Sequence, residues 1–163
     1  MSTRTGGDAR FEDGGERPLA LRAEAPEDVA ILSALVQDAV LPAADLRYER
    51  RKRRFALLLN RFRWEDRAAA ERSGRPYERV RSLLVIDFVL AAKTQGLPGR
   101  DGDTVLSLLA IAYEPGAEGA GTLTLTFAGD GALRLAVECV DLTLTDVTRP
   151  WRAPSGKAPQ HPD

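Results

Sequence analysis

The strongest constraint on the fold is a strict alternation of apolar and polar residues on both sides of a glycine-containing turn at residues 128–131. Successive side chains of a β-strand point to opposite faces, so residues two apart share one face. Two alternating runs joined by a short turn of this kind predict a β-hairpin with one buried face. We expect that face to consist of Leu123, Leu125, Phe127, Leu133, Leu135, Val137 and Cys139.

A second hairpin is predicted nearer the middle of the chain. Leu46 and Tyr48 alternate with charged residues, a basic segment follows, and a new alternation begins at Phe55. This second strand continues to Trp64, but along it the apolar positions change from odd to even numbers. One extra residue in a strand produces such a change, which predicts a β-bulge near residues 59–61.

Further apolar runs predict the remaining strands. One long strand has apolar residues along one face from 80 to 90 and should end near residues 95–96. Residues 105–113 are apolar on both faces, as in a central strand. The apolar positions change parity again after Cys139, which predicts a bend in the last strand. Residues 65–74 are polar and rich in alanine, so we expect a long connection or one or two helical turns there.

The clearest helix signal lies near the N-terminus. Pro26 suits the first helical position, the acidic residues that follow favour the positive end of the helix dipole, and Pro42 prevents the helix from continuing. Apolar residues recur at helical spacing between these prolines, so one face of the helix should pack on the core. That face consists of Val29, Leu32, Val36 and Val40, widened by Ile31 and Leu35.

These elements predict an α+β domain: a curved antiparallel sheet of roughly six to seven strands with one N-terminal helix packed on it. The parity changes in long strands also allow closure into a small barrel, and a fold like the pleckstrin-homology barrel is one option. We assign residues 1–17 to a disordered N-terminal tail, residues 18–148 to the single α+β domain and residues 149–163 to a proline-rich C-terminal tail.

The rarity of histidine and cysteine excludes several classes of enzyme. The only histidine, His161, lies in the C-terminal tail, and the only cysteine, Cys139, lies in an apolar run where we expect it to be buried. A Ser-His-Asp or Cys-His site would therefore have to take its base from a tail. The same rarity argues against a Cys/His zinc site or a disulfide framework, and we predict neither a metal nor a cofactor.

Composition also bears on location. An apolar fraction of 44% supports a packed core, and residues 1–17 lack the apolar segment of a secretory signal. No apolar run approaches the roughly 20 residues that span a bilayer. We therefore expect a cytoplasmic protein with no membrane partner.

Four strings are together specific, although each alone fits many antiparallel domains. They are VQDAVL at residues 36–41, RFALLLNRFRWE at 54–65, VLSLLAI at 105–111 and FAGDGALRLAVEC at 127–139. With these strings, about residues 18–151 resemble the bacterial family catalogued as domain of unknown function 2948. The resemblance implies a stand-alone, cytoplasmic, single-domain protein. It supplies no catalytic residue, because the activity and ligands of the family are not established.

Positive charge is concentrated in one part of the chain. The segment from Arg47 to Arg81 holds 13 basic and 5 acidic residues, whereas the whole chain has a formal net charge of -1. Basic residues lie at the tip of the second hairpin, and the strand that follows adds groups suited to phosphate contact and base stacking. The full set is Arg50, Arg51, Lys52, Arg53, Arg54, Asn60, Arg61, Arg63 and Trp64.

This set predicts a non-enzymatic binding module that recognises an anionic macromolecular partner, a nucleic acid or an acidic protein, through an arginine-rich hairpin. If the five tip charges all contact nucleic-acid phosphates, log K against log salt falls with a slope of roughly -4. Two alternatives stay open. In the first, the hairpin tip is a solvated surface that keeps a sheet edge unpaired or docks on the protein's own acidic surface. In the second, Trp64 caps the core.

A second hypothesis is a small-ligand or carboxylate-based catalytic pocket at the mouth of a barrel. Asp87 lies in an apolar strand and Glu138 on a later one, and paired carboxylates serve acid–base chemistry when burial separates their pKa values. Arg61 or Arg63 would orient the anionic substrate. Alternatively, both carboxylates face solvent and pair across strands with arginines. Homodimerisation through an exposed strand edge is compatible with either hypothesis.

Overall fold

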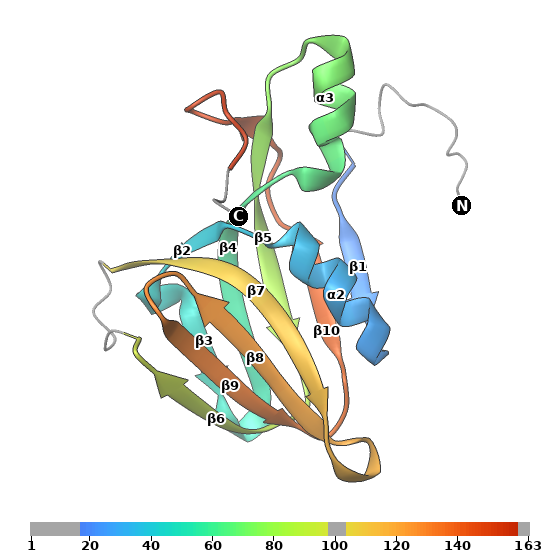
Figure 1. Ribbon diagram of the computed structural model, residues 1–163, viewed down its shortest axis with the longest axis vertical. Helices are drawn as coiled ribbons and strands as arrows, with labels where there is room; N and C mark the ends of the chain where they lie inside the picture. The colour runs from blue at the N-terminus through green and yellow to red at the C-terminus, as the bar shows by residue number, and fades with distance from the viewer. Residues whose placement is uncertain (1–16, 98–103, 160–163) are drawn as a thin grey trace.

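The computed structural model describes residues 17–97 and 104–159. In this part of the chain, two short helices accompany an antiparallel sheet of 11 strands (Figure 1). The helices are α2 (Pro26–Leu35) and α3 (Arg67–Ser73). The strands are β1 (Ala20–Ala23), β2 (Ala39–Pro42), β3 (Leu46–Glu49), β4 (Arg54–Phe62), β5 (Glu78–Ile86), β6 (Val89–Gln95), β7 (Val105–Pro115), β8 (Gly121–Phe127), β9 (Gly131–Val137), β10 (Leu142–Asp146) and β11 (Trp151–Arg152).

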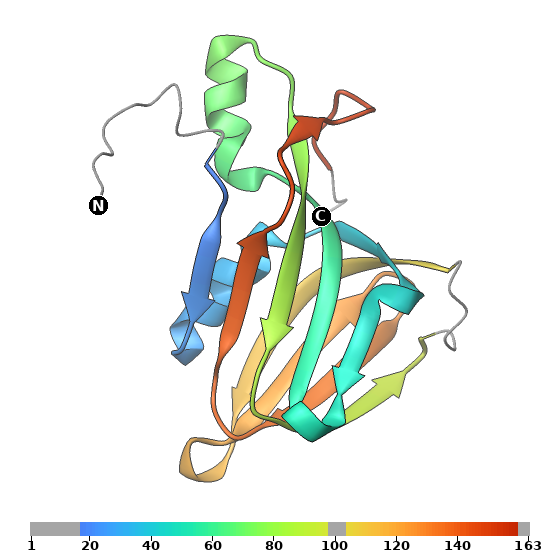
Figure 2. The ribbon, with the colours of Figure 1, turned by 180° about the vertical axis from the view of Figure 1, so that it is seen from behind.

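The sheet curls into two layers that enclose the core. Its strand order is β1-β10-β5-β4-β2-β7-β8-β9-β6, with β3 paired to β4 and β11 paired to β5. Strands β6 to β9 form one layer, and β1, β10, β5 and β4 form the other (Figures 1 and 2). Strand β2 joins the layers because it pairs with both β4 and β7. The order of the described strands ends at β1 and β6, so the sheet is open, and the option of closure into a small barrel is not the structure found.

The alternating hairpin has the predicted structure. Strand β8 pairs with β9 so that Leu123 lies opposite Leu135 and Leu125 opposite Leu133. Six of the seven predicted inward side chains are at most 1% exposed. Each such burial stabilises the fold by about 1.5–3 kcal/mol relative to the exposed side chain. The seventh prediction is wrong, because Cys139 lies beyond the end of β9 and is exposed.

The helices differ in number from the prediction. Helix α2 follows β1, and a second helix, α3, lies between β4 and β5, within the segment expected to hold helical turns. Helix α2 packs mainly on β7 and buries Val29 and Leu32. Ile31, predicted to widen its apolar face, is 57% exposed because it points away from the sheet.

The sheet has more strands than predicted for two reasons. Strands β2 and β11 lie where a continuing helix and a C-terminal tail were expected, and two expected long strands are each divided by a turn. Strand β5 ends at Ile86 and β6 begins at Val89. Between them Phe88 adopts a φ of 60°, and after it the buried positions change parity. Similarly, the last predicted strand is two strands, β9 and β10, separated by residues 138–141.

The predicted bulge near residues 59–61 is wrong. Strands β4 and β5 keep an unbroken register, from Phe55 opposite Ile86 to Phe62 opposite Arg79. Arg61 continues the buried odd-numbered face of β4. Phe62 is buried as well, and its ring contacts the rings of Trp64 and Tyr77. The strand therefore looks irregular in sequence because both of its faces are covered at this end.

Ordered structure extends past residue 148. Strand β11 pairs with Arg79 and Glu78 of β5, and Ala153 is buried. The predicted tail over residues 1–17 lies outside the described residues except for Arg17, as does His161 in the C-terminal tail. Among the described helices, none has the length and apolar character needed to cross a membrane.

The left-handed backbone conformation of Phe88 yields the first prediction. A residue with a Cβ atom pays about 1–2 kcal/mol in the left-handed region, whereas glycine does not. Phe88→Gly and Phe88→Ala remove the same ring, so we expect the glycine variant to be more stable by about 1 kcal/mol. Urea unfolding of both variants measures this difference. Equal stability, or a more stable alanine variant, would show that the backbone at residue 88 is not strained.

Candidate functional site

Three chain reversals meet at one end of the curled sheet, which we call the corner. They are the β3–β4 turn at residues 50–53, the β5–β6 turn at residues 87–88 and the β9–β10 connection at residues 138–141. Backbone hydrogen bonds fix them together. The Val89 amide donates to the Arg53 carbonyl (2.8 Å), the Glu138 amide to Phe88 (3.0 Å) and the Asp87 amide to Asp141 (3.0 Å). The relative position of the three turns is therefore set by the main chain.

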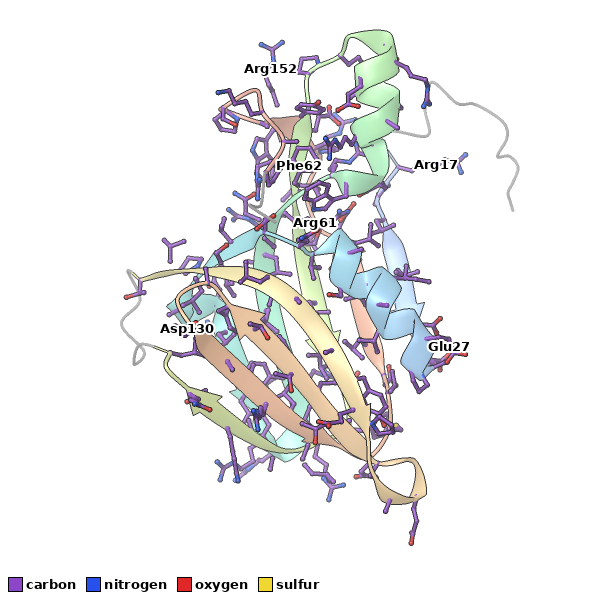
Figure 3. All side chains as sticks on the ribbon, viewed as in Figure 1. Arg17, Glu27, Arg61, Phe62, Asp130 and Arg152 are labelled. Atoms are coloured by element: carbon purple, nitrogen blue, oxygen red, sulfur yellow. The ribbon has the colours of Figure 1, made fainter. Side chains whose placement is uncertain are left out.

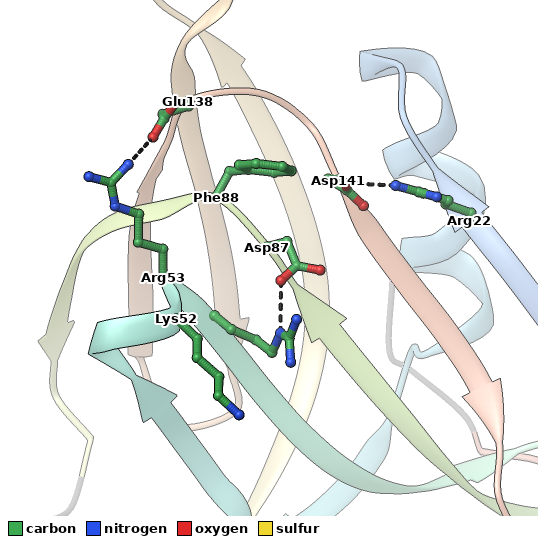
Figure 4. Close-up of a pocket in the computed structure, with 8 residues that line it drawn as sticks. Arg22, Lys52, Arg53, Asp87, Phe88, Glu138 and Asp141 are labelled. Atoms are coloured by element: carbon green, nitrogen blue, oxygen red, sulfur yellow. Dashed lines mark hydrogen bonds and ion pairs between the residues drawn. The ribbon is translucent and has the colours of Figure 1, made fainter.

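The corner surrounds an open hollow of about 480 Å³ (Figure 4). Three arginine–carboxylate pairs border it: Arg53 with Glu138 at 2.5 Å, Arg54 with Asp87 at 2.8 Å, and Arg22 with Asp141 at 3.0 Å. Each pair joins two segments that are distant in sequence. Exposed pairs of this kind add about 0–1 kcal/mol each to stability, so their main effect is to hold the charged groups in place.

Acidic neighbours neutralise much of the predicted basic tip. The hydrogen bond and charge of Asp87 raise the pKa of Arg54, and Lys52 lies 3.8 Å from Glu49. Within the described part of the chain, Arg50 and Arg51 form no ion pair, although the Arg50 guanidinium lies 5.7 Å from the ring centre of Tyr48. The tip therefore presents two unpaired cations instead of five.

An aromatic side chain lies in the lining of the hollow. Phe88 is 44% exposed, and its carbonyl and the flanking amides are used to join the turns of the corner. Figure 4 shows its ring between the pairs formed by Glu138 and Asp141. Phe88 could not be assigned to this site from the sequence, because the predicted alternation of residues 80–90 placed it in the core.

Arg61 belongs to a different site, a buried cluster at the base of α3 (Figure 3). Its side chain is fully buried and donates through Nε to Ser82 Oγ (2.9 Å). Its two Nη atoms donate to Glu65 at 2.8 Å each, and Nη2 also donates to Asp146 at 3.0 Å. Burial lowers the pKa of Arg61, but Glu65 and Asp146 outweigh it and the net shift is upward.

Arg63 extends this cluster. Its Nη1 donates to Glu78 at 2.5 Å and lies 3.6 Å from Asp66, while its buried Nε has no hydrogen-bond partner among the described residues. Asp66 in turn accepts two hydrogen bonds from Arg75, at 2.9 and 3.1 Å. These contacts join the segment that carries α3 to strand β5.

The two remaining predicted residues also make internal contacts. Asn60 Oδ1 accepts a hydrogen bond of 2.6 Å from Arg79 Nε. The Trp64 indole donates to the Gln37 carbonyl at 3.0 Å while its ring packs edge-on against Phe62. The interpretation of Trp64 as a cap on the core fits these contacts.

The structure separates the residues of the predicted catalytic pocket. Asp87 and Glu138 both lie at the corner, each paired with an arginine of the hairpin, as the alternative interpretation expected. Arg61 lies opposite Val80, at the other end of β5 from Asp87. The predicted combination of these carboxylates with Arg61 or Arg63 in one pocket is therefore wrong.

The comparisons with known proteins identify one family. The model of the family described as "Protein of unknown function (DUF2948)" matches residues 19–161, which is most of the chain. The chain therefore belongs to this family. Neither the search of curated proteins nor the search of solved structures found a match.

The buried cluster predicts a large effect on stability. Arg61→Met removes the shared partner of Glu65 and Asp146, and the loss of one member of a buried pair costs about 3–5 kcal/mol. Arg51→Met, at an exposed position without an ion pair, should stay within about 0.5 kcal/mol of the original protein. Guanidinium unfolding compares the two variants. Similar values for both would contradict the assigned role of Arg61.

Cys139 allows a test of the electrostatics at the corner. Although Cys139 is exposed, partial desolvation of its thiol, followed by the charges of Asp141 and Glu138, raises the pKa of that thiol. A smaller thiolate fraction at neutral pH should make its reaction with iodoacetamide at pH 7.5 slower than that of the uncharged model thiol N-acetylcysteine amide, with a profile shifted to higher pH. Glu138→Gln removes one of the raising charges and should increase the rate. A rate above that of the free thiol would contradict the raised pKa.

Proposed function

We propose that this family member is a cytoplasmic, non-enzymatic binding module whose corner docks an acidic segment of a partner protein. The observation that carries the proposal is Phe88, a half-exposed ring on a left-handed backbone among three arginines. A bulky residue with positive φ is uncommon, and such strained positions cluster at binding sites. Aromatic and arginine side chains are also those that dominate protein interfaces.

The hairpin tip supports an acidic partner. Arg50 and Arg51 are exposed beside the hollow and carry charge that no described acidic residue neutralises. Arg53 and Arg54 are held by carboxylates in fixed positions, so little side-chain entropy is lost when a partner contacts them. A partner carboxylate can accept hydrogen bonds from the guanidinium atoms that Glu138 and Asp87 leave unused.

The same geometry favours a protein over a nucleic acid. Asp87, Glu138 and Asp141 line the hollow, and they repel a continuous phosphate backbone. A protein segment can place basic groups opposite these carboxylates and acidic groups opposite the arginines. For a nucleic acid, the two unpaired cations would give a salt slope of only roughly -2. The charged lining also departs from the mostly apolar surface typical of small-molecule pockets.

Site-specific cross-linking tests the proposal. The photoreactive residue p-benzoylphenylalanine replaces Phe88 in the full chain, and the protein is irradiated in a lysate of cells that express it naturally. We expect a discrete protein adduct whose yield falls by about tenfold when Arg50 and Arg51 are also changed to glutamate. Gel electrophoresis and mass spectrometry identify the adduct and the cross-linked segment, which should be acidic.

Val147 provides a matched control. It is 49% exposed, close to the 44% of Phe88, and its amide bonds to Arg81 near the opposite end of β5. The same photoreactive residue at position 147 should give no such adduct. Equal adducts at the two positions, no adduct at position 88, or an adduct that nuclease removes would overturn the proposal.

A further inference from the structure

Two cations lie side by side on the outer face of the layer formed by β6 to β9. Lys93 of β6 is directly opposite Arg134 of β9 in the antiparallel register, and Arg134 is also opposite Thr124 of β8. Both basic side chains are exposed. Within the residues that the structure describes, neither one has an ion pair or a side-chain hydrogen bond. The face therefore carries two adjacent positive charges with no internal partner.

A hollow of about 230 Å³ accompanies this pair. Ala91, Thr122 and Ala136 form the rest of its lining. The hollow exists because these neighbours are small, so only the two long basic side chains rise above the sheet. The Thr122 hydroxyl makes no hydrogen bond to any other described residue, and it can donate one to a ligand. The lining thus combines two cations, one free hydroxyl and an apolar floor.

Folding does not explain this arrangement. Like charges directly opposite each other on neighbouring strands are destabilising. A lysine on an edge strand protects the edge from pairing with another chain, and β6 is the last strand of the order. That role accounts for Lys93 but not for Arg134, because β9 is paired on both sides, with β6 and β8.

We propose that Lys93 and Arg134 bind the phosphate group of a small phosphomonoester, with Thr122 as a third donor. Such a phosphate carries about -1.5 to -2 charges at neutral pH, which matches the two cations, whereas a carboxylate neutralises only one. The planar guanidinium of Arg134 can donate two parallel hydrogen bonds to phosphate oxygens, and the Lys93 ammonium acts as a point charge. Ala91 and Ala136 contact the carbon atoms of the ester.

This site is independent of the proposed function. Its residues lie on the outer face of strands β6, β8 and β9, whereas the corner is built from the β3–β4, β5–β6 and β9–β10 reversals. No residue lines both hollows. Loss of one binding activity therefore leaves the other intact, and the two proposals fail separately.

Thermal unfolding with and without inorganic phosphate tests the site. In phosphate-free buffer of low ionic strength, Lys93→Gln and Arg134→Gln should each raise Tm by up to about 2 °C, because each variant removes the repulsion. Phosphate at tenfold its dissociation constant should raise the Tm of the original protein by roughly 3–5 °C. In either variant the phosphate-dependent rise should be lost. Acetate at equal ionic strength should produce a smaller rise in the original protein.

Arg72→Gln is the matched control, because Arg72 is exposed on α3 and has no ion pair among the described residues. This variant should respond to phosphate like the original protein. Amide chemical shifts should change with phosphate only in β6, β8 and β9, and glycerol phosphate should bind at least as tightly as inorganic phosphate. Equal responses in all variants, equal effects of acetate and phosphate, or weaker binding of glycerol phosphate would overturn the proposal.

Discussion

The carboxylate of Asp146 is the contact on which the rest of the structure depends. It accepts hydrogen bonds from Ser82 Oγ at 2.6 Å, from Arg61 at 3.0 Å and from the Leu19 amide at 2.8 Å. Strands β5, β4 and the segment before β1 therefore meet at one residue of β10. Because buried ionic groups lose hydration, this node is stable only when every partner is present. It ties together strands of the layer formed by β1, β10, β5 and β4.

The regular part of the fold could be predicted from the sequence. Buried and less buried residues alternate from Leu123 to Phe127 and again from Gly131 to Val137, and this one periodicity was enough to assign the β8–β9 hairpin and its buried face. The breaks between β5 and β6 and between β9 and β10 could not be predicted in the same way. A change of parity at Phe88 or after Cys139 has the same pattern whether a strand bulges, bends or ends, and only the three-dimensional contacts distinguish these cases. These two breaks account for part of the low strand count, and the unpredicted strands β2 and β11 account for the rest.

The site was predictable only in part. A run of basic residues between two alternating segments indicated the hairpin tip, and the structure places Lys52, Arg53 and Arg54 in the lining of the corner hollow. Pairing partners were not predictable, because Glu138 is 85 residues from Arg53 along the chain. Arg61 was misassigned because a charged residue is rarely buried. Its odd-numbered position, in phase with Leu57 and Leu59, was the signal that could have identified it.

The pairing of β11 with the first residues of β5 has a practical consequence. Strand β11 lies beside α3, at the opposite end of β5 from Asp87 (Figure 2). A linker attached at the exposed Ser155, in the turn after β11, therefore leaves the molecule at that end. Immobilised through such a linker on a sensor chip, the protein would present the corner, with Arg53 and Arg54, to the solution. Shortening the chain before Trp151 would instead uncover the edge of β5 at Glu78 and Arg79, and favour self-association.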